Sequence, residues 1–276
     1  MGLVSKLNKV KLSSLNYYAF WLHLLSAIAI AIAFGVMKKE INFNTSLYTY
    51  KITDISGDTN QNVEFDFGED SPHIDVNGYS LQTIVVLIFF ITALFHWYYY
   101  KSSNYYKEVA KGYNRYRWVE YGITATLMIF VLAIISGIKE LYATLLLVCS
   151  SIVLMSFGYF FEMNKDRKVK LSALIMGFFI FTYTWAVFWG NFVPNLLSAK
   201  EIGYEIPSWV YGVLTPMIFW WLSFGIIAIL NFKAYKKKDY DFKRYERYYI
   251  LLSYFSKAFM GYYLTFGLTR DAAEKS

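Results

Sequence analysis

Charged residues are scarce in this chain of 276 residues. Only 17% are Asp, Glu, Lys or Arg, while 57% are hydrophobic and 21% aromatic. This composition excludes an ordinary soluble domain, in which about 25% of residues are charged. Apolar runs of about 20 residues, enough to cross a bilayer as a helix, recur along the chain instead. We therefore expect an integral, multi-pass membrane protein.

Cysteine is almost absent as well. The single cysteine, Cys149, excludes an intramolecular disulfide. Because it lies in an apolar run, we expect it to pack in the core. The sequence also has no internal repeat and no low-complexity segment.

The apolar runs predict an all-α seven-transmembrane-helix bundle. Its helices are expected at about residues 17–37, 80–100, 118–138, 141–161, 171–193, 208–230 and 248–268. They leave no stretch long enough for a soluble domain, so residues 1–276 are predicted to form one domain. A signal peptide is the alternative for the first run. That run is long for a signal core and contains His23, so we expect a retained helix.

The positions of Lys and Arg predict the orientation of the bundle. With the N-terminus in the cytoplasm, nineteen of the 27 basic residues lie in cytoplasmic segments and seven lie outside. Short cytoplasmic loops are enriched in Lys and Arg, so we expect a cytoplasmic N-terminus and an extracellular C-terminus. The net charge of +7 then indicates contact with anionic lipid, with no nucleic acid as partner.

One long extracellular loop, at about residues 38–79, follows the first span. It holds eight acidic residues against three lysines. The segments SLYTYKITDI and NVEFDF alternate partly between apolar and polar residues and are separated by the turn-rich SGDTNQN. We therefore predict a short β-hairpin in this loop.

Few ionisable residues lie inside the predicted spans. They are His23, His96, Glu120 and Lys257, the last of these within SYFSKAFMGYY. Charges are costly in hydrocarbon, so each is a candidate functional residue. Lys257 lies about ten residues past Arg247, too deep for its ammonium to reach the interface.

Burial gives Lys257 a specific chemistry. Desolvation favours the neutral amine, which is a nucleophile toward a carbonyl, so an aldehyde would form a Schiff base there. The protonated form needs an anion, and Glu120 is the carboxylate within the predicted spans. Helical spacing places Tyr249, Ser253 and Gly261 on the face of Lys257. The same spacing places Thr124 and Met128 on the face of Glu120.

Structural explanations remain open for each of these residues. Lys257 and Glu120 would form a purely structural ion pair, or Glu120 would be an interfacial acid. His23 and His96 would be hydrogen-bonded core histidines, or would bind zinc with Glu120, although no fixed local spacing supports a metal site. Tryptophans such as Trp185 and Trp220 more often serve in packing than in ligand binding.

Seven spans, a lysine in the last and a carboxylate in the third resemble a microbial-type rhodopsin. The predicted orientation is similar to that of the heliorhodopsins, because ordinary microbial rhodopsins place the N-terminus outside. RWVEYGITATLM, residues 117–128, resembles the heliorhodopsin helix 3 signature, and SYFSK resembles the helix 7 retinal attachment site. His23 and His96 match the family's histidines in helices 1 and 2. Gly122 and Thr124 stand where the family usually has serine, which bears on the colour of the chromophore.

This resemblance implies all-trans retinal as the cofactor, bound to Lys257 as a Schiff base with Glu120 as counterion. The residues expected to line the site are Ser253, Tyr121, Thr124, Met128, Trp185 and Trp220. The polar network expected to accept the proton contains His23, His96, Arg117 and Tyr249. The resemblance also implies a homodimer and a downstream partner that is often unknown. We expect that signalling partner at the cytoplasmic face, and we expect no bound metal.

The predicted function is therefore light sensing by a retinal photoreceptor that is not an enzyme. Proton pumping needs a donor acid on helix 3, but Val131 stands eleven residues past Glu120, and no carboxylate lies in the outer half of any predicted span. One alternative is a light-gated proton or cation conductance. A more distant one is a metal-dependent intramembrane hydrolase that uses both histidines and Glu120.

Overall fold

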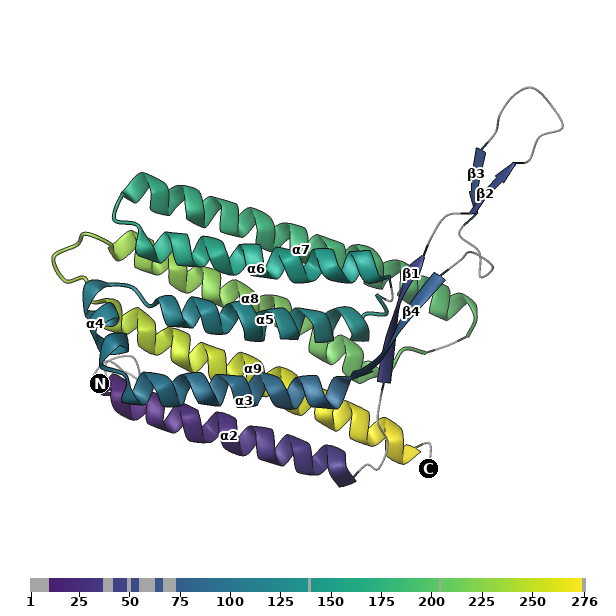
Figure 1. The fold of residues 1–276 in the computed structure, drawn as a ribbon, viewed down its shortest axis with the longest axis horizontal. Helices are drawn as coiled ribbons and strands as arrows, with labels where there is room; N and C mark the ends of the chain where they lie inside the picture. The colour runs from purple at the N-terminus through teal and green to yellow at the C-terminus, as the bar shows by residue number, and fades with distance from the viewer. Residues whose placement is uncertain are drawn as a thin grey trace.

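A computed structural model describes residues 10–36, 42–48, 51–54, 63–66, 73–138, 140–203 and 205–274. Seven long helices lie side by side in these residues, and a short helix, α4, lies at one end of the bundle (Figure 1). The helices are α2 (Leu12–Val36), α3 (Leu81–Lys101), α4 (Ser103–Lys111), α5 (Arg115–Ile135), α6 (Leu141–Met163), α7 (Arg167–Glu201), α8 (Ser208–Ala234) and α9 (Phe242–Glu274). Because α2 begins at one end of the bundle and α9 ends at the other, the chain crosses it an odd number of times.

Local sequence signals explain several helix boundaries. The side chains of Ser80, Asn114 and Asp166 accept hydrogen bonds from backbone N–H groups in the first turns of α3, α5 and α7. Ser102 separates α3 from α4 and caps α4, while Gly112 ends α4 with a φ of 91°. The helix α4 was not predicted, because the segment between the second and third apolar runs has too few apolar residues to stand out.

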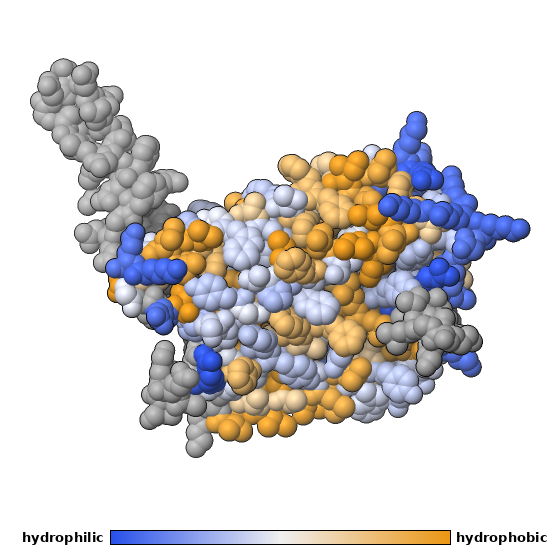
Figure 2. Space-filling model, turned by 180° about the vertical axis from the view of Figure 1, so that it is seen from behind, coloured by the Kyte–Doolittle hydropathy of each residue, from blue (hydrophilic) through white to orange (hydrophobic). Residues whose placement is uncertain are grey.

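Six of the described helices are long and apolar enough to cross a membrane: α2, α3, α5, α6, α7 and α8. The helix α9 is also long, at 33 residues, but tyrosines and Lys257 lower the hydropathy of its middle. Large apolar side chains on these helices point outward, among them Ile32, Phe179, Phe219 and Phe266, each more than 60% exposed. Strongly hydrophilic residues gather instead at the ends of the bundle (Figure 2). The chain is thus a multi-pass integral membrane protein.

Four strands lie between α2 and α3. They are β1 (Asn42–Tyr48), β2 (Lys51–Asp54), β3 (Val63–Asp66) and β4 (His73–Ser80). β1 pairs antiparallel with β4, from Asn42 opposite Ser80 to Tyr48 opposite His73, and β2 pairs antiparallel with β3, from Lys51 opposite Asp66 to Asp54 opposite Val63. β2 and β3 fall within the two segments from which the sequence predicted a hairpin. The predicted turn falls at residues 56–62, outside the described residues.

The interior of the bundle is packed with apolar side chains. A large cluster joins α2, α3, α5, α6, α7, α8 and α9, and includes the fully buried Phe89, Leu132, Met217 and Leu264. The prediction for Cys149 was wrong, because its side chain is exposed on the outer surface of α6. A helix in lipid is apolar on all sides, so an apolar run does not indicate which residues face inward.

Candidate functional site

Lys257 lies in the interior of the bundle, in the middle of α9. Its side chain is only 3% exposed, and its Nζ atom donates hydrogen bonds to Glu120 Oε1 at 2.9 Å and to Ser253 Oγ at 2.7 Å. Ser253 lies one helical turn before Lys257, as the spacing predicts. The structure thus brings together a lysine and a carboxylate that are 137 residues apart in the sequence.

Glu120 lies on α5, and each of its two carboxylate oxygens has a partner. Oε1 accepts from Lys257, and Oε2 accepts from the Tyr99 hydroxyl at 3.4 Å. The next residue, Tyr121, places its ring centroid 5.2 Å from Lys257 Nζ and donates its hydroxyl to the backbone carbonyl of Tyr249. Tyr99 was not among the predicted site residues, because a tyrosine near the end of an apolar run resembles an interfacial aromatic residue.

His23 and His96 stack on each other, with ring centroids 5.3 Å apart and planes at 18°. His23 Nδ1 pairs with the carbonyl of Ala19, and His96 Nδ1 pairs with Asn16 Oδ1 at 2.9 Å. Within the part of the chain that the structure describes, neither histidine hydrogen-bonds Glu120, and the Nε2 atom of each has no partner. The connection to Glu120 passes through Tyr99, whose ring packs edge-on against His96 at 5.4 Å.

A cavity extends from Lys257 between α5, α6, α7, α8 and α9. It contains about 910 Å³ of empty space, part of which is open to the surroundings. Its serine and threonine side chains, Ser253, Ser256 and Thr124, lie on the helices of Lys257 and Glu120, and most of its wall is aromatic or apolar. Such a cavity fits a long apolar ligand held at one polar end. The amine at that end and the apolar wall suit retinal, which has an aldehyde and a polyene chain.

The cavity wall includes some of the predicted residues and not others. Tyr121, Met128 and Tyr249 line it, along with those already named. Trp185 and Trp220 do not; Trp221 lines the cavity instead, and Trp185 packs against Trp221 with ring centroids 6.4 Å apart.

Two small residues shape the wall of this cavity. A Cβ atom at Gly158 would lie 2.0 Å from the Trp118 ring, so glycine there allows the ring to pack against α6. A Cβ atom at Gly225 would lie 2.8 Å from Phe178. Larger residues at these positions would push aromatic side chains into the cavity.

Arg117 belongs to a separate buried ion cluster, three residues before Glu120. Its guanidinium group donates to both Glu162, in the last turn of α6, and Glu246, near the start of α9. Asn114 adds a backbone bond to Glu162 at 3.1 Å and a side-chain bond to Glu246 at 2.8 Å. The structure therefore places Arg117 with two carboxylates rather than with the histidines.

Sequence reasoning missed Glu162 and Glu246 because each lies just outside an apolar run. Both are almost completely buried all the same, at 4% and 1% exposure. The Arg117 guanidinium also lies 4.1 Å from the centroid of Tyr249, which links this cluster to the cavity wall. No group of three potential metal ligands occurs among the described residues, so a zinc site formed by His23, His96 and Glu120 has no structural support.

The overall fold is similar to that of microbial rhodopsins. A light-driven proton pump from Leptosphaeria maculans has a TM-score of 0.64 and 12% identity, with 96% of this chain and 95% of that chain covered. A thermophilic rhodopsin has a TM-score of 0.63 and 13% identity, with 96% of both chains covered. The transmembrane domain of the Salpingoeca rosetta rhodopsin phosphodiesterase has a TM-score of 0.63 and 11% identity, with 93% and 83% covered.

The sequence comparisons are more specific than the fold. No curated protein matches the chain. A family model described as heliorhodopsin matches residues 12–268, which include the buried lysine, its carboxylate partner and both histidines. The chain therefore belongs to the heliorhodopsin family, whose members have the rhodopsin fold and bind retinal as photoreceptors.

Proposed function

We propose that this protein is a sensory photoreceptor that binds all-trans retinal as a protonated Schiff base on Lys257, with Glu120 as counterion. The observation that carries the proposal is the 2.9 Å contact between Lys257 Nζ and Glu120 Oε1, which lies at the polar end of an apolar cavity. Bound retinal supplies light absorption and a change of shape on illumination. Every other part of the mechanism is assigned to the side chains around it.

Glu120 has two tasks in this proposal. In the dark, its carboxylate stabilises a positive charge on the Lys257 nitrogen, which burial alone would disfavour. After illumination, Glu120 is positioned to accept the proton from that nitrogen, because the two atoms are within hydrogen-bonding distance. Ser253 accepts a second hydrogen bond from Nζ and fixes its direction.

The stacked histidines are the second candidate for the proton. His23 and His96 are buried, and each has an Nε2 atom without a protein partner in the described part of the chain. A proton that reaches Glu120 can move into this group through water bound at these Nε2 atoms. Such a change of charge would alter the pairing of α2, α3 and α5, and would carry the signal to the cytoplasmic face.

The distribution of buried acids favours a sensor over a pump. Among the described residues, the buried carboxylates are Glu108, Glu120, Glu162 and Glu246. All four lie between Lys257 and the end of the bundle that bears α4. A pump needs proton-exchanging groups on both sides of the Lys257 nitrogen, and the outer part of α5 has Val131 where a donor acid would stand.

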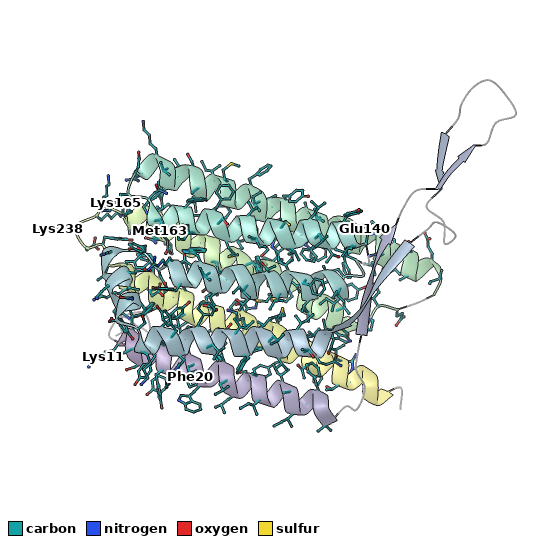
Figure 3. All side chains as sticks on the ribbon, viewed as in Figure 1. Lys11, Phe20, Glu140, Met163, Lys165 and Lys238 are labelled. Carbon is teal, nitrogen blue, oxygen red and sulfur yellow. The ribbon has the colours of Figure 1, made fainter. Side chains whose placement is uncertain are left out.

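We further propose that α9 is a seventh membrane span and that the end of the bundle bearing α4 is cytoplasmic. Lys11, Lys165 and Lys238 lie at that end, and Glu140 lies at the opposite one (Figure 3). This asymmetry supports a cytoplasmic N-terminus and an extracellular C-terminus. The proposal includes a homodimer in the lipid bilayer, an unidentified cytoplasmic partner and no enzymatic activity.

A light-gated proton conductance is the second candidate. The observation that favours it is the series of polar side chains that runs from Lys257 through Glu120 and Tyr99 toward the end of the bundle bearing α4. Photocurrents under voltage clamp distinguish the two functions. A sensor gives no steady current on illumination, whereas a conductance gives a current that reverses with the proton gradient.

The absorption spectrum tests the proposed photoreceptor. Protein expressed with all-trans retinal is expected to show a band in the visible range, and Lys257→Ala is expected to show none. Lys170→Ala is a matched control, because Lys170 is also buried but donates to the backbone carbonyls of Phe161 and Glu162. A wild-type protein without a visible band, or a Lys257→Ala variant that keeps it, would contradict the proposal.

A further inference from the structure

Two stacked tyrosines lie between Glu120 and the Arg117 ion cluster. Tyr99 is near the end of α3 and Tyr105 is in α4, and their ring centroids are 4.9 Å apart with planes at 17°. Both side chains are buried, with 2% and 0% exposure. The helix is interrupted at Ser102, which separates α3 from α4. The Ser102 side chain accepts the backbone N–H of Tyr105, and the turn at this residue allows the two tyrosine rings to stack.

Each tyrosine donates its hydroxyl to a different buried carboxylate. Tyr99 donates to Glu120 Oε2 at 3.4 Å, the oxygen that Lys257 leaves free. Tyr105 donates to Glu246 Oε1 at 3.1 Å, and Glu246 in turn is bound by Arg117. The pair therefore connects the two ionic sites through side chains from α3 and α4 alone.

The hydroxyl of Tyr105 is a stable donor in this arrangement. Burial raises the pKa of Tyr105 well above its ordinary value, and the negative charge of Glu246 acts in the same direction. The hydroxyl therefore keeps its proton and keeps donating to the carboxylate. Tyr99 has a different environment, because its ring also meets His96 and so touches both candidate acceptors of the proton from Lys257.

We propose that Tyr99 is a positioning residue for Glu120, and that the stacked pair of Tyr99 and Tyr105 couples Glu120 to the Arg117–Glu162–Glu246 cluster. This inference rests on the proposed function, since it concerns the counterion of a retinal site. When Glu120 gains a proton, its attraction for the Tyr99 hydroxyl weakens. Tyr99 is then free to shift, and a shift of its ring displaces the ring of Tyr105, which is bonded to Glu246. The coupling is reciprocal, so a change at Glu246 alters the surroundings of Glu120.

The wavelength of the visible absorption band of the retinal-loaded protein measures this coupling. Tyr99→Phe keeps the ring and removes one donor from Glu120, so negative charge concentrates near the Lys257 nitrogen. We expect a shift to shorter wavelength, on the order of 5 to 10 nm, as one hydrogen bond to a charged group is lost. Tyr105→Phe keeps the stack and removes only the bond to Glu246, and its shift should have the same sign and be smaller.

The double variant separates coupling from local packing. If the effect of Tyr105→Phe passes through Tyr99, it should disappear when Tyr99 is already phenylalanine. Tyr106→Phe is the matched control, because Tyr106 is the next residue of α4 and donates to the backbone carbonyl of Tyr100 rather than to either carboxylate. Its band should stay at the wild-type position.

Three results would overturn parts of this account in distinguishable ways. Absence of a band in the wild type would overturn the proposed function and this inference with it. A wild-type band that Tyr99→Phe does not move would overturn the positioning role alone. A shift in Tyr105→Phe that persists unchanged in the Tyr99→Phe background would overturn the coupling and leave the positioning role intact.

Discussion

Two buried ionic sites lie three residues apart on α5, and they differ in the cation that each contains. Glu120 meets Lys257, whose Nζ atom bonds one carboxylate and one hydroxyl and lines the cavity. Arg117 meets two carboxylates that also receive bonds from Asn114 and Tyr105. A guanidinium group does not lose its proton in proteins, whereas an amine is able to do so.

This difference indicates a chemical role for the Lys257 site and a structural role for the Arg117 cluster. The Lys257 site has an amine, a carboxylate partner and space for a ligand, and in the proposed function its charge changes on illumination. The Arg117 cluster ties α5, α6 and α9 together, and its fixed positive charge holds two carboxylates that would otherwise repel each other. We expect substitutions at the first site to change the spectrum and substitutions at the second to change stability.

The largest expected effect on stability is that of Arg117→Met. It leaves Glu162 and Glu246 buried without their cation, at a cost of about 3–5 kcal/mol. Thermal unfolding in detergent or nanodiscs measures this loss, with the exposed Arg167→Met as a control. Equal unfolding temperatures for the two variants would show that the cluster does not hold the helices together.

Glu120→Gln should affect the band rather than the fold. Without the negative charge, the ground state of the protonated linkage is less stabilised, so the band moves to longer wavelength, on the order of tens of nanometres. The absorption spectrum of the retinal-loaded variant measures this shift. Glu162→Gln is its control, and a larger shift in that control would assign the counterion to the other site.

Much of this contrast could be predicted from the sequence, but not all of it. The runs of about 20 apolar residues located the long helices, and charge inside those runs identified Lys257 and Glu120. Glu162 and Glu246 lie one turn or less outside the runs, where a carboxylate ordinarily meets water. Their burial depends on α4 and on the packing of three helix ends, and the local sequence around each glutamate does not predict that packing.

The sequence also did not predict how each helix is rotated about its own axis, which decides the residues that face the interior. Trp221 rather than Trp220 lines the cavity, and Cys149 faces outward. Both residues lie in runs that are apolar on every side, because one side meets lipid and the other meets the core. Without an amphipathic pattern, nothing in the sequence marks the inner face.

Glu162→Gln is expected to lower the stability of the Arg117 cluster only slightly. The amide oxygen of glutamine can still accept from Asn114, and Arg117 keeps its pair with Glu246. We expect a loss of less than about 1 kcal/mol in the free energy of unfolding. A loss as large as that of Arg117→Met would mean that both carboxylates are needed to balance the guanidinium group.

Ser253→Ala is expected to have a small effect on both stability and the visible band. It removes the second partner of Lys257 Nζ but leaves the ion pair with Glu120, so the cost is about 1 kcal/mol. The band should move by less than in Glu120→Gln. Thermal unfolding and the spectrum of the same sample measure both quantities, and loss of the band in Ser253→Ala would show that the serine has a larger role than the counterion.

Locating the covalent link to retinal tests the assignment of Lys257 as its attachment point. Reduction of the loaded protein with borohydride fixes the linkage, and mass spectrometry of its peptides then identifies the modified lysine. We predict a retinyl group on the peptide that contains Lys257, and none on the peptide that contains the buried Lys170. A retinyl group on any other lysine, or on none in a protein that retains its visible band, would contradict the account.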